Sequence, residues 1–510
     1  MLPDNKKLEL DYTYNTLGYV SSLKYPNNDV VRFAPNAFGE PTQASSTRAV
    51  LLDTVNYASG ATYYPTGTLN TFTYGNGLVH KTTLNTAKLL SQVKDSRAGM
   101  VALDYSYTYD GNLNVKSLTD NLDATYSLTS LTYDGLDRLT AVAAGTSIKP
   151  SSISYDALGN ITKYNTGLQS LDYVYDTANQ LTTVNKTDAP LVNEYRKFTY
   201  DARGNVTNNG YRAFSFNLAN QLESSTKGST TDTYLYDGHN RRVKETDSKG
   251  VSYSMYSQDG TLIYRETIAG GINYIYLGNR LIAKDGFIPE NSSDQHFYPY
   301  GSSVEGEIDD TGYTGHKFDT DLQLSYMQAR YYDPMIGRFY SNDPMRFSNV
   351  HNFNRYTYAN NNPYKYIYPD GKAAELRSMQ PIVFKRKFNT ALNYLREAGV
   401  SGPIDRLIES ETVTVIIEDN SGFFEHAFVH DSMTILFDPN GGLDLPNGGI
   451  QSPALGLLHE AIHAEQFISN PEQFLKDLNT EYPDDLLISF IRTLKKKELF
   501  SNSKLLLLRK

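Results

Sequence analysis

The sequence predicts two kinds of structure in one chain: a long all-β part, residues 1–372, and a small α+β domain, residues 373–510. Two observations support this division. Of the 41 tyrosines, only Tyr394 and Tyr482 follow Lys372. The first part is also rich in Gly, Asn, Asp and Thr, as short strands and turns are, whereas the last part is richer in Leu, Glu and Lys, which favour helices. A chain of 510 residues is too long for one ordinary core.

The composition excludes several classes of site. The chain has no cysteine, so disulfides, thiolate nucleophiles and thiolate metal ligands are excluded. The formal net charge of −10 argues against a nucleic-acid partner and against an anionic membrane. The N-terminus lacks the apolar segment of a signal peptide, and no apolar run approaches the ~20 residues of a spanning helix. Residues 490–510 are expected to form a packed terminal helix rather than a basic membrane-surface helix.

A repeated motif organises the first part. The copies share one template, Y-x-Y-D followed by a short turn and an apolar returning strand, with Leu or Ile in place of the first tyrosine in some copies. The clear copies are 107–115, 131–142, 153–164, 173–184, 198–209 and 234–245; segment 214–222 and the degenerate segments 12–23 and 274–283 extend the series.

Each copy predicts a β-hairpin. The alternation places both aromatic rings on one face of a strand. Asp caps the turn and Gly supplies its positive φ, so these aspartates are interpreted as turn formers and not as catalysts. One hairpin of about twenty residues cannot bury its own face, and the copies are therefore expected to stack.

The repeats resemble the tyrosine–aspartate (YD) repeats of Rhs proteins, insecticidal toxin-complex C components and teneurins, over residues 10–370. Segments "TGHKFD", "LSYMQARYYDPMIGRF" and "NRYTYANNNP" also closely resemble the conserved end of the bacterial Rhs core. The resemblance implies a β-sheet strip that wraps a hollow shell (1–310), a conserved core segment (311–372) and a variable toxin domain held inside (373–510).

The same resemblance implies a polymorphic toxin with a cognate immunity protein. It also implies secretion, or delivery to the cell surface, by a specialised secretion machinery. Neither a nucleic-acid partner nor stable membrane insertion is expected.

Self-cleavage after the core, by a pair of aspartates, is a further implication of the resemblance. Asp343 matches the first aspartate, but the partner position is Tyr368. Because one carboxylate alone cannot share a proton as a dyad does, we expect slow or absent self-cleavage. Asp370 could substitute only if the backbone shifted. Asp343 and Asp333 also fit the simpler interpretation of Asp-Pro turn residues.

The last 138 residues predict alternating helices and strands. A helix is expected after Pro381 and is stopped near Gly399. Residues 412–419 are β-branched and strand-like, 426–439 predict two strands, and 440–449 are rich in turn residues.

Residues 453–467, "PALGLLHEAIHAEQF", contain an H-E-x-x-H motif. Ser452 and Pro453 predict a helix start. His459 and His463 then lie one turn apart on one face, where two imidazoles can bind one Zn²⁺ ion, and Glu460 lies beside the metal as a general base.

Residues 435–485 resemble the zincin-type peptidase domains found at Rhs C-termini. The resemblance implies a zinc-dependent endopeptidase that acts on a protein of the target cell. A metal-free helix with surface histidines is the simpler alternative.

A zinc site needs a third protein ligand. With no cysteine and no later histidine, this ligand is a downstream carboxylate or an upstream histidine, and we choose Glu481. Glu465 is too near on the same helix and points away. Tyr482 and His430 are candidate oxyanion stabilisers. The other downstream carboxylates are Glu472, Asp477, Asp484 and Asp485.

Two histidines upstream of the motif are weaker candidates. At i, i+4 on a strand, His426 and His430 lie too far apart to share one metal, and half-exposed strand residues are the simpler interpretation. Two other functions also stay open for the chain. It could be a non-enzymatic adhesion or carbohydrate-binding surface protein, or an Rhs toxin with a different C-terminal activity.

Overall fold

The chain divides into two compact units, Met1–Met379 and Gln380–Lys510, whereas the sequence placed the division after residue 372. The structure is a computed structural model. It describes residues 4, 6–167, 169–187, 196–288, 295–344, 354–369, 371 and 375–376 of the first unit, and 391–392, 394–396, 398–409, 416–419, 427–429, 433–437, 453–471, 473–474 and 505–507 of the second. Within these residues, no helix is long and apolar enough to cross a membrane.

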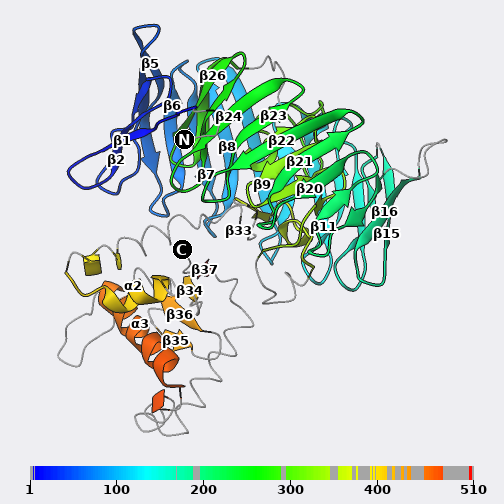
Figure 1. The fold of residues 1–510 in the computed structure, drawn as a ribbon. Helices are drawn as coiled ribbons and strands as arrows, with labels where there is room; N and C mark the ends of the chain where they lie inside the picture. The colour runs from blue at the N-terminus through cyan, green and yellow to red at the C-terminus, as the bar shows by residue number, and fades with distance from the viewer. Residues whose placement is uncertain are drawn as a thin grey trace. The chain divides into compact units, whose positions relative to one another are not determined.

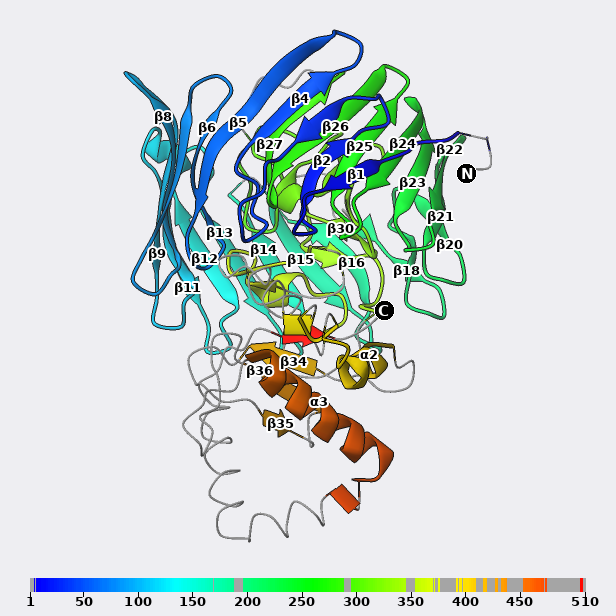
Figure 2. The ribbon, with the colours of Figure 1, turned by 90° about the vertical axis from the view of Figure 1, so that its left-hand side faces the viewer.

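A strip of antiparallel strands makes up most of the first unit (Figure 1). Strands β1–β17 form one sheet and β18–β27 a second, and each strand pairs with its neighbour in the chain. Only Phe198 separates the two sheets, and its N–H donates to the Thr182 carbonyl at 2.8 Å. Figure 2 shows the strip curled, with β8–β9 and β20–β22 on opposite sides of β30. The expected stack of β-hairpins is therefore confirmed.

The strand bounds of the strip are β1 Asp11–Tyr14, β2 Val20–Lys24, β3 Val30–Arg32, β4 Ala44–Arg48, β5 Asp53–Tyr63, β6 Leu69–Tyr74, β7 Val79–Leu84, β8 Leu90–Arg97, β9 Met100–Tyr109, β10 Val115–Asp120, β11 Leu128–Tyr133, β12 Leu139–Ala144, β13 Ser151–Tyr155, β14 Ile161–Asn165, β15 Ser170–Tyr175, β16 Leu181–Lys186, β17 Arg196–Lys197, β18 Thr199–Tyr200, β19 Val206–Asn208, β20 Ala213–Phe216, β21 Leu222–Lys227, β22 Thr230–Tyr236, β23 Arg242–Asp247, β24 Gly250–Tyr256, β25 Leu262–Thr267, β26 Gly270–Leu277 and β27 Arg280–Gly286. The segment inside the curl adds β28 Lys317–Asp319, β29 Leu324–Met327, β30 Arg330–Asp333, β31 Arg338–Phe339, β32 Tyr366–Ile367 and β33 Glu375–Leu376, and three short 3₁₀ helices are Ala124–Tyr126, Tyr313–Gly315 and Ala359–Asn361.

In most copies of the repeat, the hairpin turn is closed by the side chain of its Asp or Asn. Asp134 Oδ1 accepts from the N–H groups of Leu136 and Arg138, both at 3.0 Å, and its Oδ2 accepts from Arg138 Nε at 2.7 Å. The repeat aspartates are therefore turn formers, as predicted. The backbone pattern recurs at Asn15, Asn36, Asp110, Asp156, Asp176, Asp201, Asn217 and Asp237.

The positive φ of these turns lies three residues after the Asp. Gly159 and Gly204 occupy that position with φ 78° and 85°, as expected for glycine. Where glycine directly follows the Asp, the prediction is wrong: φ is positive at Leu113 (64°) and Asp137 (59°) instead. The turn network stabilises the left-handed conformation in these side-chain-bearing residues.

Neighbouring turns are also linked to one another by side chains. Asn114 Nδ2 donates to Asp137 Oδ1 at 2.9 Å, and Arg138 Nη1 donates to the Asp156 carbonyl at 3.2 Å. Asn205 continues the pattern to Asn220 Oδ1 at 2.9 Å. The turns therefore form a hydrogen-bonded row along one edge of the strip.

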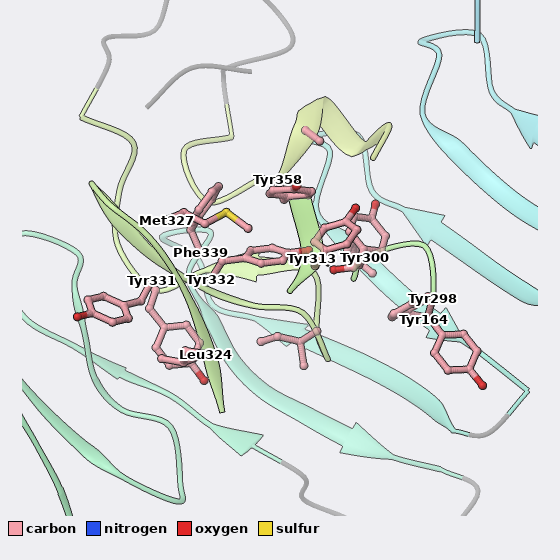
Figure 3. Close-up of a cluster of buried hydrophobic side chains, with 14 of the residues drawn as sticks. Tyr164, Tyr298, Tyr300, Tyr313, Leu324, Met327, Tyr331, Tyr332, Phe339 and Tyr358 are labelled. Carbon is pink, nitrogen blue, oxygen red and sulfur yellow. Dashed lines mark hydrogen bonds between the residues drawn. The ribbon is translucent and has the colours of Figure 1, made fainter. Parts of the chain in front are cut away.

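The segment after β27 packs into the curl and builds an aromatic core. Tyr332 and Tyr358 stack with ring centroids 4.3 Å apart, and Tyr332 Oη donates to the Tyr300 carbonyl at 2.7 Å. Figure 3 shows these rings beside Phe339 and Tyr313. In the same cluster lie apolar residues of the repeat strands, so the segment and the strip share one core.

Asparagines of the "NRYTYANNNP" segment bind the row of turns. Asn362 Nδ2 donates to Asn114 Oδ1 at 2.9 Å and to the Asp137 carbonyl at 2.8 Å. Asn354 Nδ2 donates to Asn160 Oδ1 at 2.6 Å. These contacts show that Asn354 and Asn362 of the segment hold it against the turns.

The second unit combines helices with a mixed four-stranded sheet. Helices α2 (Gly402–Glu409) and α3 (Pro453–Ser469) pack on each other and on a sheet of order β35-β36-β34-β37. The strands are β34 Ile416–Asp419, β35 Ala427–Val429, β36 Thr434–Phe437 and β37 Leu505–Leu507.

Two elements of the second unit differ from the sequence expectation. Helix α2 begins at Gly402, shortly after the Gly399 region where the sequence predicted only a helix end. The expected terminal helix is wrong at Leu505–Leu507, because these residues pair with β34 as a strand. The assignment of the unit to the zincins stays a prediction.

Candidate functional site

Helix α3 carries the H-E-x-x-H residues. Its buried face, with Leu457, Ala461 and Ala464, packs into the core of the second unit, and this packing fixes the rotation of the helix. The Nε2 atoms of His459 and His463 lie 3.0 Å apart. His459 is exposed and His463 is half-buried.

The two imidazoles fit a shared metal ion. Two Zn–N bonds at a tetrahedral angle hold their nitrogens about 3.3 Å apart, close to the distance between the two Nε2 atoms. A metal-free pair is also compatible with the geometry, because one neutral imidazole can donate to the other. The donor set therefore suits Zn²⁺ without requiring it.

Glu460 is the buried member of the motif. Its side chain is 6% exposed, and burial raises the pKa of Glu460 to about 7, against the effect of a hydrogen bond from the Phe428 backbone. A carboxyl group with a pKa near neutrality can exchange a proton with a bound reactant.

An aromatic cluster lies beside the histidines. Ring centroids of His463 and Phe474 are 5.8 Å apart, and those of Phe428 and Phe467 are 5.9 Å apart. Phe428 belongs to β35, so the sheet edge, the helix and residue 474 together form one wall of the candidate site.

A third metal ligand is not among the described residues, where no group of three His, Asp or Glu side chains could hold a metal. Glu481, Tyr482 and His430 lie outside the described residues, as do His426 and the other downstream carboxylates. Glu465 is described and is engaged elsewhere, in a two-bond pair with Arg406 (2.6 and 2.8 Å).

Asp343 and Tyr368, the two positions that match the self-cleavage pair, both lie close to the buried Arg330. Arg330 Nη2 lies 2.8 Å from Asp343 Oδ2, and the Arg330 guanidinium lies 5.0 Å from the Tyr368 ring centroid. Arg330 Nε donates to the Gly371 carbonyl at 2.6 Å. His316 Nε2 donates to the Tyr368 carbonyl at 2.7 Å.

Tyr368 supplies a phenol where a second carboxylate is needed. Burial raises the pKa of Tyr368, although the Arg330 charge opposes the change, so this phenol stays protonated at neutral pH. Asp370 lies outside the described residues. Asp333 closes the turn between β30 and β31, with Met335 N–H donating to Oδ1 at 3.0 Å, as the simpler interpretation expected.

Sequence reasoning missed Arg330 and the hydroxyl groups of the repeat tyrosines. Arg330 stands in the fixed letters of "ARYYDP", which was the only available signal. The Tyr133 hydroxyl donates to the Val115 carbonyl of the preceding hairpin at 2.7 Å, a contact between hairpins that no single repeat can show.

The comparisons with known proteins concern mainly the repeat part. Residues 102–195 match the family model described as the teneurin YD-shell. The "tRNA3(Ser)-specific nuclease WapA" of Bacillus spizizenii is 28% identical over 301 residues, which are 56% of this chain and 11% of that protein. The chain thus spans about a tenth of the length of this curated relative.

Solved structures share the fold. A TcdB2-TccC3-Cdc42 complex aligns with TM-score 0.53 and 16% identity over 75% of this chain and 22% of the other. The Tc holotoxin pore of Photorhabdus luminescens aligns with TM-score 0.53 and 17% identity over 73% and 22%. The repeat part therefore has the fold of a YD-repeat shell.

Proposed function

We propose that the chain is part of a YD-repeat toxin. Its first unit forms part of the shell, and its second unit is a hydrolase. The observation that supports the hydrolase assignment is the geometry of α3. The Nε2 atoms of His459 and His463 lie 3.0 Å apart, and the carboxyl group of the adjacent Glu460 is buried. The fold of the first unit supports the shell. Both roles follow the interpretation that the sequence suggested.

The chemistry assigned to the site is metal-assisted hydrolysis. When bound, Zn²⁺ supplies a Lewis acid that polarises a carbonyl or phosphoryl oxygen and lowers the pKa of water. His459 and His463 would hold the ion. Glu460 accepts a proton from the attacking water and passes it to the leaving group, and its raised pKa suits both steps. Glu481 is our choice for the third ligand.

The first substrate candidate is a peptide bond in a protein of the target cell. The acidic balance of residues 373–510, with 19 Asp/Glu and 14 Lys/Arg, supports it, because a formal charge of −5 disfavours a polyanion. The aromatic cluster beside His463 also supports it, since apolar side chains of an unfolded substrate can pack there.

The second candidate is another C-terminal activity, the cleavage of tRNA. The name of the Bacillus relative supports it, and no relative reported above is a peptidase, so the comparisons favour this candidate over the peptidase. Under it, H-E-x-x-H either serves phosphodiester hydrolysis or takes no part in the reaction.

Metal analysis of the full chain tests the site. After incubation with Zn²⁺ and gel filtration, we expect about one equivalent of zinc in the wild type and about a tenth of that in His459→Ala and His463→Ala. His239→Ala, at an exposed turn of the first unit, is the matched control. Wild-type protein with no more zinc than the two variants would remove the metal from the proposal.

Activity assays distinguish the two substrates. We expect the wild-type chain to cleave an unfolded protein and Glu460→Gln to be about 10²–10⁴-fold slower. Cleavage of tRNA without cleavage of the protein would support the second candidate and reject the first. Cleavage of tRNA that survives Glu460→Gln would show in addition that H-E-x-x-H takes no part in that reaction.

The biological setting follows from the shell. Similarity to the Tc holotoxin pore supports association with a delivery machinery, and we propose extracellular delivery and a cognate immunity protein. The rival, an adhesion or carbohydrate-binding surface protein, predicts that expression of the chain inside bacteria is harmless. Growth arrest that Glu460→Gln relieves would exclude that rival.

A further inference from the structure

Strand β9 carries three tyrosines that line a cavity in the first unit. Residues 104–110 read DYSYTYD, which adds a third alternating tyrosine to the usual pair. Alternate side chains share one face of a strand, and Tyr105, Tyr107 and Tyr109 all lie half-buried in the cavity wall. The cavity has a volume of about 440 Å³, which is within the range of small-molecule sites.

The cavity lies between the strip and the segment that packs into the curl. Strand β9 and its neighbours form one wall, and residues 295–298, 313–314 and 364–365 form the other. Elsewhere along this boundary aromatic rings meet directly, as Tyr164 and Tyr300 do with centroids 5.4 Å apart. Most of the residues that line the cavity are aromatic or aliphatic, so the wall favours an apolar ring compound. The polar exceptions are Gln295, His296, Thr314 and Lys365.

A histidine and a carboxylate form a polar end of the cavity. Glu305 accepts from the backbone N–H of His296 at 2.8 Å and from His296 Nδ1 at 2.7 Å. The His296 ring also stacks on Tyr126 with centroids 3.7 Å apart. Because Nδ1 carries the hydrogen, Nε2 of the neutral ring accepts, and the Tyr105 hydroxyl, 3.3 Å away, donates to it. Toward a ligand, the Tyr105 oxygen can then act only as an acceptor.

The charges in the cavity wall are balanced by nearby groups. Lys365 Nζ donates to the Asn112 carbonyl at 2.9 Å and lies 3.6 Å from Asp137 Oδ2. His296 is paired with Glu305. A charged ligand would lose its hydration here without gaining an unpaired charge of opposite sign. The cavity therefore suits a neutral ligand.

We propose that this cavity binds a neutral compound of low molecular mass that has two or more rings and a hydrogen-bond donor. The rings pack against the tyrosines of β9, and the donor hydrogen binds the Tyr105 oxygen. All the residues that line the cavity belong to the first unit. The proposal is therefore independent of the hydrolase assigned to the second unit.

A fluorescence titration of the full chain tests the proposal. The probe is N-phenyl-1-naphthylamine, a neutral compound with an N–H donor, whose emission rises in apolar surroundings. The matched compound is 1-phenoxynaphthalene, which has an oxygen in place of the N–H group and is measured by displacement of the probe. We expect saturable binding of the probe and an affinity for 1-phenoxynaphthalene that is about fivefold lower, the ratio that one net hydrogen bond produces.

Two substitutions locate the probe on the chain. Leu118→Trp places a larger ring in the cavity, so the affinity for the probe should fall at least about tenfold. Leu69→Trp, at a half-buried leucine of β6 outside the cavity, is the matched control and should leave the affinity unchanged. Tyr105→Phe keeps the ring but removes the acceptor oxygen, so the affinity should fall about fivefold for the probe and stay unchanged for 1-phenoxynaphthalene. Tyr14→Phe, on exposed β1, is the control for this change.

Three results would overturn the proposal. A wild-type chain without a saturable change in probe emission would show that the cavity takes no such compound. Equal affinities of the wild type and a folded Leu118→Trp variant would place the probe elsewhere on the chain. An unchanged affinity of Tyr105→Phe for the probe would exclude the donor contact, and this comparison decides if Leu118→Trp loses the native circular dichroism spectrum.

Discussion

At the residue scale, a single tyrosine hydroxyl group makes a hydrogen bond between neighbouring hairpins. Tyr133 Oη donates to the Val115 carbonyl, and the ring itself is half-buried. Tyr133→Phe removes the hydrogen bond and keeps the packing, so we expect a loss of about 1 kcal/mol in the free energy of unfolding. Urea denaturation of the full chain, followed by circular dichroism, measures it.

Tyr14→Phe is the matched control for that prediction. Tyr14 occupies the same place in its hairpin but has no acceptor among the described residues, so its replacement should leave the urea midpoint unchanged. Equal losses in the two variants would show that the hydrogen bond of the Tyr133 hydroxyl is not what stabilises the contact between hairpins.

Buried His80 makes the stability of the first unit depend on pH. His80 is fully buried, with Nδ1 2.5 Å from Asp95 Oδ1 and Nε2 3.0 Å from Thr82 Oγ1. Burial lowers the pKa of His80, although Asp95 opposes this. As the pH falls below about 6.5, the unfolded chain binds the proton before the native chain does, so stability falls on acidification.

Thermal unfolding checks the His80 prediction. Between about pH 7.5 and pH 5.5, the melting temperature of the wild type should fall more than that of His80→Gln, which has no group to titrate there. His239→Gln, at an exposed turn, should behave as the wild type. A wild type and a His80→Gln variant with the same pH dependence would contradict the prediction.

Residue roles that act within one repeat could be predicted, and roles between repeats could not. Asp134 binds the backbone two and four residues ahead, so its turn role follows from a short stretch of sequence. The Tyr133 acceptor lies 18 residues back on another strand. Its identity depends on how hairpins stack, which the residue pattern does not contain.

At the element scale, the segment 354–365 holds the row of turns through amide side chains. Asn362 is 1% exposed and donates to both Asn114 and Asp137. Asn362→Ala removes these two hydrogen bonds and a third, from the Lys365 N–H to Asn362 Oδ1 at 3.3 Å, and we expect a loss of about 3 kcal/mol in the free energy of unfolding. Limited proteolysis of the full chain should show faster cleavage within this segment.

Asn362→Asp tests the reason for that loss. Aspartate has nearly the size of asparagine and keeps one of its oxygens. Its carboxylate would, however, face the two acceptor oxygens of Asn114 and Asp137 without a hydrogen to donate, so the variant should destabilise the segment more than Asn362→Ala does. A milder effect of the aspartate variant would show that the amide donors are not the stabilising groups.

The elements were predictable where the repeat kept its letters. Hairpins built on Y-x-Y-D were expected in the right places. Hairpins β3–β4, β7–β8 and β24–β25 were missed, because their turns at Asn36, Asn85 and Ser257 follow segments without a Y-x-Y pair and also lack the Asp. An amide or hydroxyl oxygen can accept the same backbone hydrogen bonds as a carboxylate. The turn therefore forms with Asn or Ser as well as with Asp, although the sequence motif was defined by Asp.

At the scale of the whole molecule, we expect the purified chain to stay intact. Asp343 is paired with Arg330, and the partner position is the protonated phenol of Tyr368, so these two positions do not form the pair of carboxyl groups that self-cleavage needs. Intact mass spectrometry should find a single species of 57.2 kDa after prolonged incubation. Separate N- and C-terminal fragments that disappear in Asp343→Ala would contradict this.

The residues of the H-E-x-x-H site could be predicted from the sequence to different extents. Spacing alone placed His459 and His463 on one helical face, and the structure brings their Nε2 atoms together. The burial of Glu460 depends on β35, whose position no spacing rule supplies. The choice of Glu481 falls outside the described residues and stays a prediction.

The row of turns has a consequence for the order in which the chain folds. Most strip contacts join hairpins next to each other in sequence, so the strip can grow one hairpin at a time, as repeat proteins do. The asparagine contacts of segment 354–365 instead span 194 to 248 residues, and closing such long loops is slow. We therefore expect segment 354–365 to dock only after the earlier turns have formed. A docked segment then indicates that the strip of hairpins is complete.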